Sequence, residues 1–439
     1  MKYDIYFEKA KANNIDELEL SITSNYSLSF SIFRGEIESY STSNETGLLA
    51  RGTYNGKAGY VNTEKFDKST VDYVITKIKE NASVNNSSDE VIIFKGSEKY
   101  HKKNVFNSKL HKIPTETKIA LIKEIENTLK GMDNRISDVE VSYSEGIDEY
   151  VLMNSYGLNL KSKANYCSIV AEVVAKGEND ETKTSYKVFV DNDLDKFDIK
   201  DFTTKLVDDT ISQLGGSPCH SGQYKTVLNP GVTAALLSSF LSNAIADEVQ
   251  KNTSLFKGKI NQLVASKKIT IEERPLDKTP YFRYFDDEGV ATYNKKIIDK
   301  GVLKTYLYNL ATAKKDNTTS TGNGYRGGGK VDTSTASIVL KPGKVSEEEL
   351  FKLVDNGIYI TSVEGLHAGM NAQSGNFSLQ ASGYLIKNGQ KADPVCLITV
   401  AGNLFDVFKN VVEVGSNLET RSNRQTPSIY ISNLSVSGI

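Results

Sequence analysis

The sequence predicts an α+β fold, with strands and helices in its N-terminal half and mainly strands in its C-terminal half. Apolar and polar residues alternate at Leu18, Leu20 and Ile22, which is typical of a strand with one buried face. Asn-Gly pairs at 55–56 and 388–389 predict tight turns between antiparallel strands, because both residues tolerate positive φ. Other segments repeat apolar residues every three or four positions, which is the period of a helix.

The first 95 residues are expected to form an α/β unit. Its expected elements are a helix at 4–13, a hairpin with strands at 18–22 and 26–32 and a turn at 23–25, a second hairpin with strands at 47–54 and 58–61, and a helix that begins after Asp67. Asp67 or Ser69 is a suitable N-cap for that helix. The polar stretch 81–90 ends the unit.

A middle α/β segment is expected over residues 96–221. Its expected elements are a helix at 114–132, strands at 139–143, 150–154, 158–164 and 168–175, and a helix at 199–214. Gly215-Gly216 ends the last helix, since glycine is common just past a helix end. The main division of the chain is placed near Gly222.

The C-terminal domain, residues 222–439, is expected to be rich in strands. Its expected elements are helices at 231–250 and 346–354 and strands at 269–273, 292–299, 302–309, 336–341, 357–364, 377–387, 394–401 and 428–431. Ser346 with Glu349 predicts a capping box. Four apolar residues spaced by four predict one continuous helix over 231–250: Leu237, Leu241, Ile245 and Val249.

Blocks of sequence in one order resemble the TldD/PmbA family. The blocks are VLNPGVTAALL, LFKGKINQLVASKKITIEERP, FDDEGVAT, KKIIDKGVLKTYLYNLATAKK, STGNGYRGG, VEGLHAGMNAQSGNFSLQASGYLIKNGQ and ITVAGNLFDVFKNVVEVGSNLETRS. The last two are more similar to the PmbA (TldE) branch. The resemblance implies an α/β N-terminal region with an antiparallel sheet and a C-terminal, largely antiparallel, barrel-like β domain.

The resemblance also implies that the zinc motif HExxxH of the metal-bearing branch is missing here. Ser242 stands at the first His position, Asn243 at the Glu position and Asp247 at the second His position. The corresponding C-terminal region, LETRSNRQTPSIYI, has no Cys. One carboxylate cannot complete a four-coordinate zinc site. We therefore expect no metal or other cofactor on this chain, with zinc on a TldD-type partner.

The leading hypothesis is a non-catalytic subunit of a TldD/TldE-type metallopeptidase complex that acts on unfolded peptides or proteins. The alternative is a stand-alone, homodimeric peptide-binding or scaffold protein without peptidase activity. A third hypothesis is a peptidase with a rearranged site built on Asp247, Glu248 and the acidic turn 286–289.

Three further features are candidates for a substrate groove. Asp286, Asp287 and Glu288 could bind a cation or a peptide amine, but a structural turn whose charges stay in solvent is the favoured interpretation. The glycine-rich segment 320–330, with Gly322, Asn323 and Gly324, is either a loop that lines a groove or a plain flexible loop. The third feature is His367, which has no visible partner.

Composition narrows the choice of partners and compartment. The 439 residues carry 53 Lys plus Arg and 55 Asp plus Glu, so the formal charge of −2 offers no broad attraction for nucleic acid. No run approaches the roughly 20 apolar residues that cross a membrane. The charged start has no apolar segment typical of a signal peptide. Three widely spaced cysteines (Cys167, Cys219 and Cys396) predict free thiols in a reducing cytoplasm.

Overall fold

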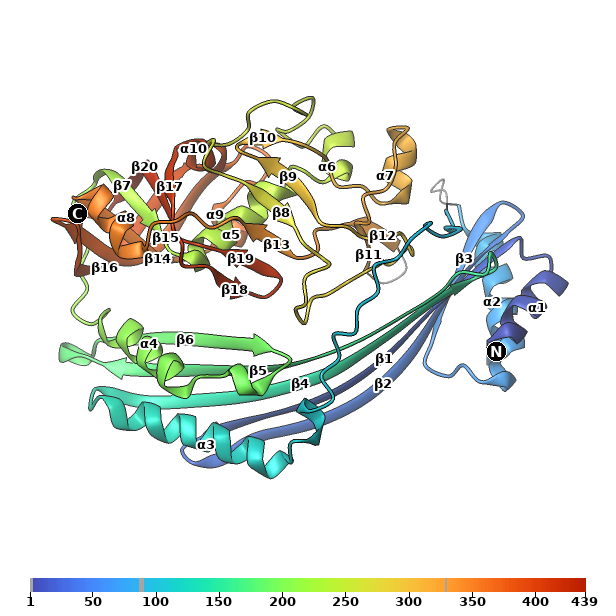
Figure 1. The fold of residues 1–439 in the computed structure, drawn as a ribbon, viewed down its shortest axis with the longest axis horizontal. Coiled ribbons are helices and arrows are strands. Elements are labelled where there is room, and N and C mark those ends of the chain that lie inside the picture. The colour runs from blue at the N-terminus through green and yellow to red at the C-terminus, as the bar shows by residue number, and fades with distance from the viewer. Residues whose placement is uncertain (1–2, 87–90, 328–329) are drawn as a thin grey trace.

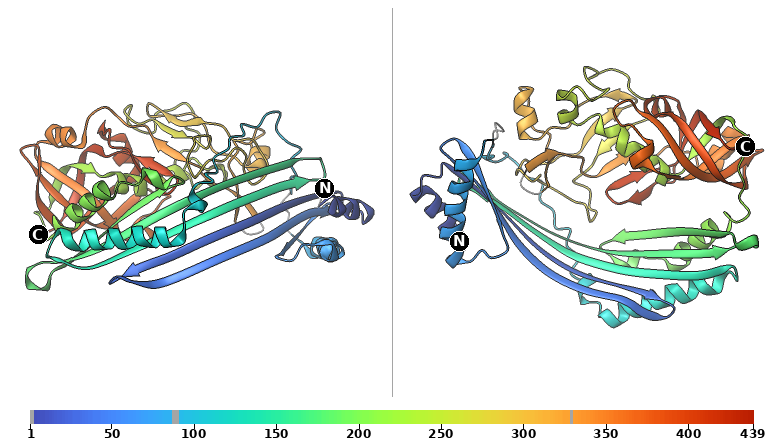
Figure 2. Two further views of the ribbon diagram at one scale, coloured as in Figure 1. Left: turned by 60° about the horizontal axis from the view of Figure 1, so that its bottom comes forward. Right: turned by 180° about the vertical axis from the view of Figure 1, so that it is seen from behind.

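The computed structural model describes residues 3–86, 91–327 and 330–439, which form an N-terminal half built on one long curved sheet and a C-terminal half that faces this sheet (Figure 1). The turned views show α3 on the face of the sheet away from the C-terminal half (Figure 2). The predicted α+β fold is confirmed. None of the helices in these residues combines the length and the apolar character that crossing a membrane requires.

The N-terminal sheet has six antiparallel strands in the order β3-β2-β1-β4-β5-β6. The strands are β1 (Glu17–Phe33), β2 (Glu36–Tyr54), β3 (Lys57–Thr63), β4 (Ile136–Asn154), β5 (Asn159–Lys176) and β6 (Thr182–Asp191). The α-helices are α1 (Asp4–Ala12), α2 (Val71–Val84), α3 (Thr115–Met132) and α4 (Ile199–Ile211). Short 3-10 turns lie at Lys68–Thr70, Leu110–Lys112, Glu178–Asp180 and Leu194–Lys196. The sheet therefore takes strands from both residues 1–95 and residues 96–221.

The expected hairpin with a turn at 23–25 is wrong, because residues 17–33 form the single strand β1. Thr23 pairs with Gly47 on one side and with Tyr150 on the other, so the polar interval lies inside the sheet. The actual turn is at Arg34-Gly35, where both residues have positive φ. Strand β1 carries polar residues at its centre because it crosses between two separate hydrophobic cores, one under α1 and α2 and the other under α3 and α4.

Strands β4 and β5 were likewise each predicted as two shorter strands, although each is continuous. Expected strands at 139–143 and 150–154 are parts of β4, and those at 158–164 and 168–175 are parts of β5. By contrast, the Asn55-Gly56 turn, the helix at α3 and the helix after Asp67 are confirmed. The last four residues of the polar stretch, 87–90, lie outside the described residues.

Helix α2 packs directly on the backbone of β3 at Gly59. A Cβ atom added to Gly59 would lie 1.9 Å from the carbonyl oxygen of Ile78. Gly59→Ala is therefore expected to lower the free energy of unfolding by about 1–3 kcal/mol, as overpacking does elsewhere. Chemical denaturation measures this change. Gly131→Ala is the matched control, since its Cβ would meet no atom within 4 Å, and an equal loss in both variants would contradict the prediction.

A five-stranded barrel forms the centre of the C-terminal half. Its strands are β16 (Gln390–Asn403), β15 (Asn376–Lys387), β14 (Gly357–Glu364), β7 (Gly222–Leu228) and β20 (Ile429–Ser437). Strands β20 and β16 also pair, which closes the ring, and β17 (Val411–Val414) extends β20. Within the ring only the β14–β7 pairing is parallel. The implied barrel-like, largely antiparallel domain is confirmed.

A second six-stranded sheet and six helices complete the part of this half that the structure describes. The sheet has the order β10-β9-β8-β13-β19-β18, with β8 (Ile271–Glu273), β9 (Lys295–Asp299), β10 (Val302–Leu303), β13 (Ile338–Leu340), β18 (Glu419–Arg421) and β19 (Arg424–Thr426). A two-stranded sheet joins β11 (Gly324–Gly327) and β12 (Lys330–Thr333). The helices are α5 (Pro230–Ser242), α6 (Ala246–Gln250), α7 (Leu310–Lys315), α8 (Glu347–Val354), α9 (Leu366–Gly369) and α10 (Leu404–Lys409).

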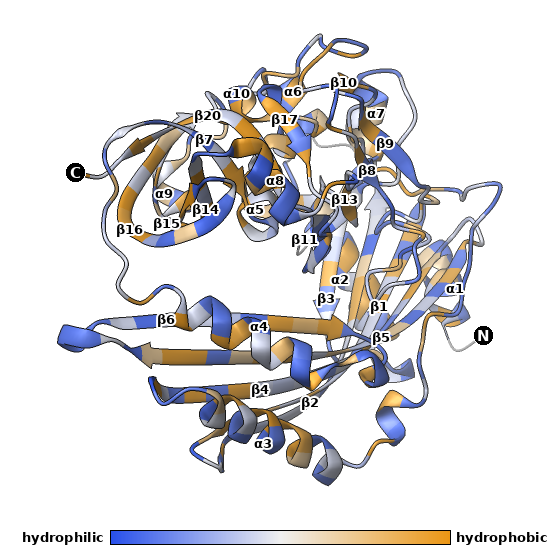
Figure 3. Ribbon diagram, turned by 60° about the vertical axis from the view of Figure 1, so that its left-hand side comes forward, coloured by the Kyte–Doolittle hydropathy of each residue, from blue (hydrophilic) through white to orange (hydrophobic). Residues whose placement is uncertain are grey.

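Side chains alternate between the two faces of the barrel strands, so the two faces pack against different hydrophobic cores. Ile358 and Ile360 of β14 belong to the large core that includes α5, whereas Tyr359 between them belongs to a smaller core with α8. Figure 3 colours much of β16 and β5 as hydrophobic, as expected for strands covered on at least one face. The three cysteines are buried and free.

Candidate functional site

The helix at the position of the missing metal motif is broken. α5 ends at Ser242 and α6 starts only at Ala246, so the expected single helix over 231–250 is wrong. The segment between them pairs with a distant part of the chain. The N–H of Leu307 donates to the carbonyl of Ala244 at 2.8 Å, and the N–H of Ala246 donates to the carbonyl of Leu307 at 3.0 Å. These long-range bonds replace the helical bonds that the local period predicts.

Two of the three motif side chains are engaged in hydrogen bonds within the protein. The Ser242 hydroxyl donates to the carbonyl of Ser239 at 2.8 Å. The Asn243 side-chain oxygen accepts from the N–H of Leu255 at 2.9 Å and so holds the loop that follows α6. Asp247 differs, because its Oδ2 atom is buried and has no hydrogen-bond partner in the described structure.

This set of side chains does not fit a zinc ion. Zinc sites in proteins use Cys, His and carboxylate ligands in a tetrahedral arrangement. Within residues 3–86, 91–327 and 330–439, no three His, Cys, Asp or Glu side chains lie close enough together to hold a metal ion. The Ser242 hydroxyl is hydrogen-bonded within its own helix, and the Asn243 amide is hydrogen-bonded to a loop. Asp247 is the one ionisable side chain among the three motif positions.

A hollow of about 540 Å³ opens at the helix break. Its walls come from seven residues between 242 and 253, from Asp332 and Thr333 of β12, and from residues 372–373. Ser242, Asn243 and Asp247 are thus brought together around one space. The other predicted groove residues, at 286–288, 322–324 and 367, are not among the residues that line it. His367 is exposed on the short helix α9.

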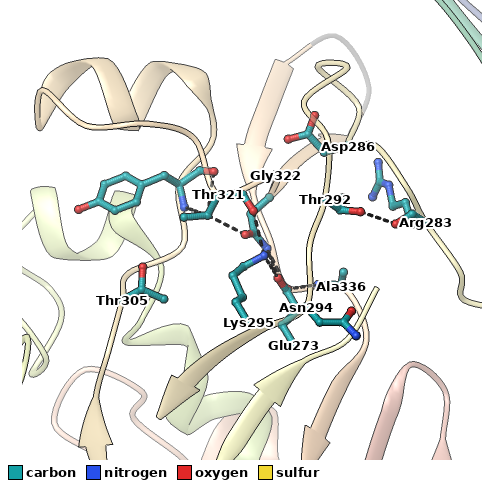
Figure 4. Close-up of polar contacts among 12 residues, drawn as sticks. Glu273, Arg283, Asp286, Thr292, Asn294, Lys295, Thr305, Thr321, Gly322 and Ala336 are labelled. Carbon is teal, nitrogen blue, oxygen red and sulfur yellow. Dashed lines mark hydrogen bonds and ion pairs between the residues drawn. The ribbon is translucent and has the colours of Figure 1, made fainter. Parts of the chain in front are cut away.

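The glycine-rich turn is buried and tightly held, so the interpretation as a flexible loop is wrong for residues 321–324. The Asn323 amide donates to both carboxylate oxygens of Glu273, at 2.8 and 3.0 Å. Lys295 lies 2.5 Å from the same carboxylate and donates to the carbonyl of Thr321 at 2.8 Å. Figure 4 shows Lys295 and Glu273 meeting next to Thr321 and Gly322. Gly328 and Gly329 lie outside the described residues.

The acidic turn at 286–289 is also buried, which corrects the expectation that its charges stay in solvent. Asp286 is 1% exposed and accepts hydrogen bonds from the N–H groups of Glu288, Val290 and Gly324 at 2.8–3.0 Å. Glu288 is 4% exposed and accepts from the N–H of Leu310, the first residue of α7, at 2.7 Å. Both carboxyl groups therefore serve as acceptors inside the structure.

Burial changes the acidity of both groups. Loss of solvation raises the pKa of Asp286 to about 6, although nearby Arg283 and three backbone N–H donors oppose the rise. Loss of solvation also raises the pKa of Glu288, and repulsion from the neighbouring Asp286 raises it further, to about 8. Burial and the neighbouring Asp286 therefore both favour the neutral form of Glu288.

Arg326 of β11 links this turn to the N-terminal sheet. Its guanidinium donates to Glu19 of β1 at 2.9 Å and to the carbonyl of Asp287 at 3.0 Å. The same Glu19 carboxylate accepts from Arg51 of β2 at 2.7 Å. Glu19, Arg51 and Arg326 were not predicted from the sequence. Glu19 and Arg326 lie 307 positions apart, so no local pattern signals their contact. The turn 286–289 therefore forms part of the joint between the two halves.

Comparison with known proteins fits this architecture. Three models of PmbA/TldA metallopeptidase domains match consecutive parts of the chain: domain 1 matches residues 18–82, the central domain 108–214 and the C-terminal domain 221–438. The chain belongs to the PmbA/TldD family. Among its relatives, the metalloprotease PmbA homolog of Haemophilus influenzae is 25% identical over 439 residues, covering 96% of this chain and 92% of that protein. The metalloprotease PmbA of Escherichia coli O157:H7 is 27% identical over 330 residues, covering 73% and 69%.

Solved structures of PmbA/TldD-like proteins share the whole fold. The Thermotoga maritima protein described as a modulator of a DNA gyrase superposes with a TM-score of 0.92 at 28% identity and covers 99% of both chains. TldE from Thermococcus kodakarensis superposes with a TM-score of 0.93 at 22% identity over 100% of both chains, which shows a common fold. In this PmbA/TldD family protein, the residues at the helix break do not fit the metal that the family name suggests.

Proposed function

We propose that this chain is a non-catalytic, PmbA/TldE-like subunit of a TldD/TldE-type peptidase complex, and that zinc resides on the TldD-type partner. The observation that carries the proposal is the state of the motif side chains. Ser242 and Asn243 are engaged in hydrogen bonds within the protein, at a place where peptide hydrolysis would need metal ligands and a general base.

In this proposal the chain supplies part of the surface on which an unfolded peptide is held. The hollow at the helix break lies beside β12, a strand of a two-stranded sheet. Strand edges can bind extended peptides through backbone hydrogen bonds, whatever the peptide sequence. A rearranged peptidase site is less well supported, because Asp286 and Glu288 are buried at the joint to the N-terminal sheet and Glu248 is hydrogen-bonded to Thr253.

The test is to purify the chain alone and together with a TldD-type chain from the same organism. The chain alone is expected to bind less than about one equivalent of zinc and to leave casein intact. Its side chains cannot supply the set of about four ligands that zinc requires. The mixed complex is expected to hold zinc on the partner and to cleave casein until a chelator is added. Metal analysis and gel electrophoresis provide the readouts.

Two controls separate the alternatives. Asp247→Ala is expected to leave the zinc content of the complex unchanged, whereas a fall in zinc content would favour a rearranged site on this chain. Failure to associate with the TldD-type chain, together with a homodimer that binds peptide, would favour the stand-alone scaffold protein. Tight zinc at about one equivalent and casein cleavage by the chain alone would refute the proposed function.

A further inference from the structure

The segment that joins α2 to α3 concentrates positive charge on the surface. Residues 91–107, all of which the structure describes, form no helix or strand, and Figure 1 shows this segment running from the β3 end of the long sheet to α3. We call residues 91–112 the basic strap. The strap carries six lysines against the single acid Glu98: Lys95, Lys99, Lys102, Lys103, Lys109 and Lys112. A chain whose formal charge is −2 thus contains one strongly cationic segment.

The protein does not neutralise these lysines. All six are exposed, and in the part of the chain that the structure describes none of them forms an ion pair. Three of the ammonium groups lie 5.1–5.9 Å from the centres of aromatic rings, in the pairs Lys95–Tyr156, Lys102–Tyr284 and Lys103–Phe282. These rings help to position the ammonium groups but leave their charge uncompensated.

The strap also offers backbone groups that the protein does not use. Among the described residues, no backbone N–H or C=O group of residues 98–104 has a hydrogen-bond partner. Side chains hold this interval in place instead: the Tyr100 hydroxyl donates to the carbonyl of Gly289 at 2.7 Å, and Lys103 Nζ donates to the carbonyl of Leu276 at 2.8 Å. Extended peptides bind to free backbone groups of this kind, whatever the peptide sequence.

These features suit an acidic polypeptide better than a nucleic acid. A polypeptide carries both N–H donors and C=O acceptors for the strap backbone, whereas a phosphodiester chain has no N–H group to donate. Three of the rings beside the strap already have an ammonium group over a face, but single-stranded nucleic acids commonly stack their bases on free aromatic faces. The formal charge of −2 also opposes a long polyanion.

We propose that the basic strap binds an extended, acidic segment of the unfolded peptide substrate. Carboxylates of the peptide pair with Lys99, Lys102 and Lys103, and the peptide backbone forms hydrogen bonds with residues 98–104. This inference rests on the proposed peptide-binding function and adds to it a preference for substrates rich in Asp and Glu.

Fluorescence anisotropy with the full-length chain tests the inference. The probes are a labelled peptide of alternating Glu and Ser, the same peptide with Gln in place of Glu, the acidic peptide with every second amide N-methylated, and an oligothymidylate of equal charge. The acidic peptide is expected to bind about tenfold more tightly than the Gln peptide at low salt, as three exposed ion pairs allow. Near 1 M salt, where the screening length falls to about 3 Å, this preference should vanish.

The N-methylated probe separates backbone pairing from simple charge attraction. It keeps every carboxylate but loses half of its N–H donors. It is therefore expected to bind about tenfold more weakly than the unmethylated acidic peptide, in line with the loss of several ordinary hydrogen bonds.

Substitutions assign the effect to the strap. Lys99→Gln/Lys102→Gln/Lys103→Gln is expected to remove the preference for the acidic peptide, and the corresponding triple change to Arg should retain it, because the charge is kept. Thermal unfolding shows whether the Gln variant is still folded. The matched control replaces three exposed lysines of the C-terminal half, which also form no ion pair in the described structure: Lys267→Gln/Lys304→Gln/Lys344→Gln.

The outcomes distinguish this proposal from the subunit hypothesis. Equal affinity for the Glu and Gln peptides, a preference that survives in the Gln variant of the strap, or no binding of any probe would overturn the acidic-peptide site. Tighter binding of the oligothymidylate would overturn it in favour of a nucleic-acid site. Equal binding of the N-methylated probe would overturn the backbone pairing. The zinc and casein experiment decides the subunit hypothesis independently of these probes.

Discussion

Lys295→Met is expected to lower the free energy of unfolding by about 3–5 kcal/mol, because it leaves an uncompensated charge in the protein interior. Lys295 is the cationic partner of Glu273, at 2.5 Å, and the two side chains are 5% and 0% exposed. Without the lysine, the Glu273 carboxylate would retain hydrogen bonds from the Asn323 amide and from the N–H of Ala336 at 2.6 Å. Neutral donors do not replace the lost ionic interaction in a buried site.

The loss should be concentrated around the glycine-rich turn. Lys295 also donates to the carbonyl of Thr321, so the turn loses this hydrogen bond directly, while Asn323 stays bonded to a glutamate that is now unpaired. Chemical denaturation gives the change in stability, and hydrogen exchange of the amides at 321–324 reports the local effect. The double variant Glu273→Gln/Lys295→Met is expected to recover much of the stability, because it removes both charges. A single variant as stable as the original chain would contradict the prediction.

The pair Lys268 and Glu413 provides a matched control. Their ion pair is of similar length, at 2.6 Å, but Lys268 is 51% exposed. Surface ion pairs contribute about 0–1 kcal/mol, so Lys268→Met should have a small effect. The comparison separates the cost of a buried unpaired charge from the simple loss of an ion pair.

Local signals in the sequence predicted local structure well. The capping box of Ser346 and Glu349 forms as expected at the start of α8. The turns at 55–56 and 388–389 have positive φ at both residues. Each of these features depends on residues no more than four positions apart, so the sequence alone contains the information.

The failures all involve contacts between distant parts of the chain. The helix over 231–250 breaks because residues 244 and 246 bond to Leu307. β1 continues through a polar interval because strands on both sides supply its hydrogen bonds. The acidic turn is buried because Arg326 and Glu19 bring the N-terminal sheet against it. Periodicity and turn propensity do not report such contacts.

The sequence predicted where the candidate site lies but not which residues form its walls. The missing ligands at 242, 243 and 247 mark the region where the hollow lies. Thr333 carried no signal, because a single threonine after a glycine-rich segment is an ordinary residue in a sequence. Only the folded chain shows that Thr333 lines the same hollow as Asp247.

Glu288 should make the folded protein less stable as the pH rises from about 5 to about 8. Its pKa is raised to about 8 in the folded chain by burial and by Asp286, against a usual value of 4.5. Between these two values the unfolded chain has released the proton and the folded chain still holds it. Stability falls with rising pH wherever the folded state binds more protons. The contribution is fully present below the lower pKa and is lost by the time the pH passes the upper one.

Glu288→Gln is therefore expected to stabilise the protein at pH 8 by about 2–3 kcal/mol and to change its stability little at pH 5. One unit of pKa difference corresponds to about 1.4 kcal/mol, and relaxation around the buried pair reduces the total. Glutamine resembles the protonated acid in shape, and its oxygen can still accept from the N–H of Leu310. Thermal unfolding from pH 5 to pH 9 measures the effect as a flatter profile. Glu364→Gln, at an exposed position of β14, should leave the profile unchanged. If Glu288→Gln lowers stability equally at all pH values, then the ionised carboxylate stabilises the joint to the N-terminal sheet, and the acid is not held there in its neutral form.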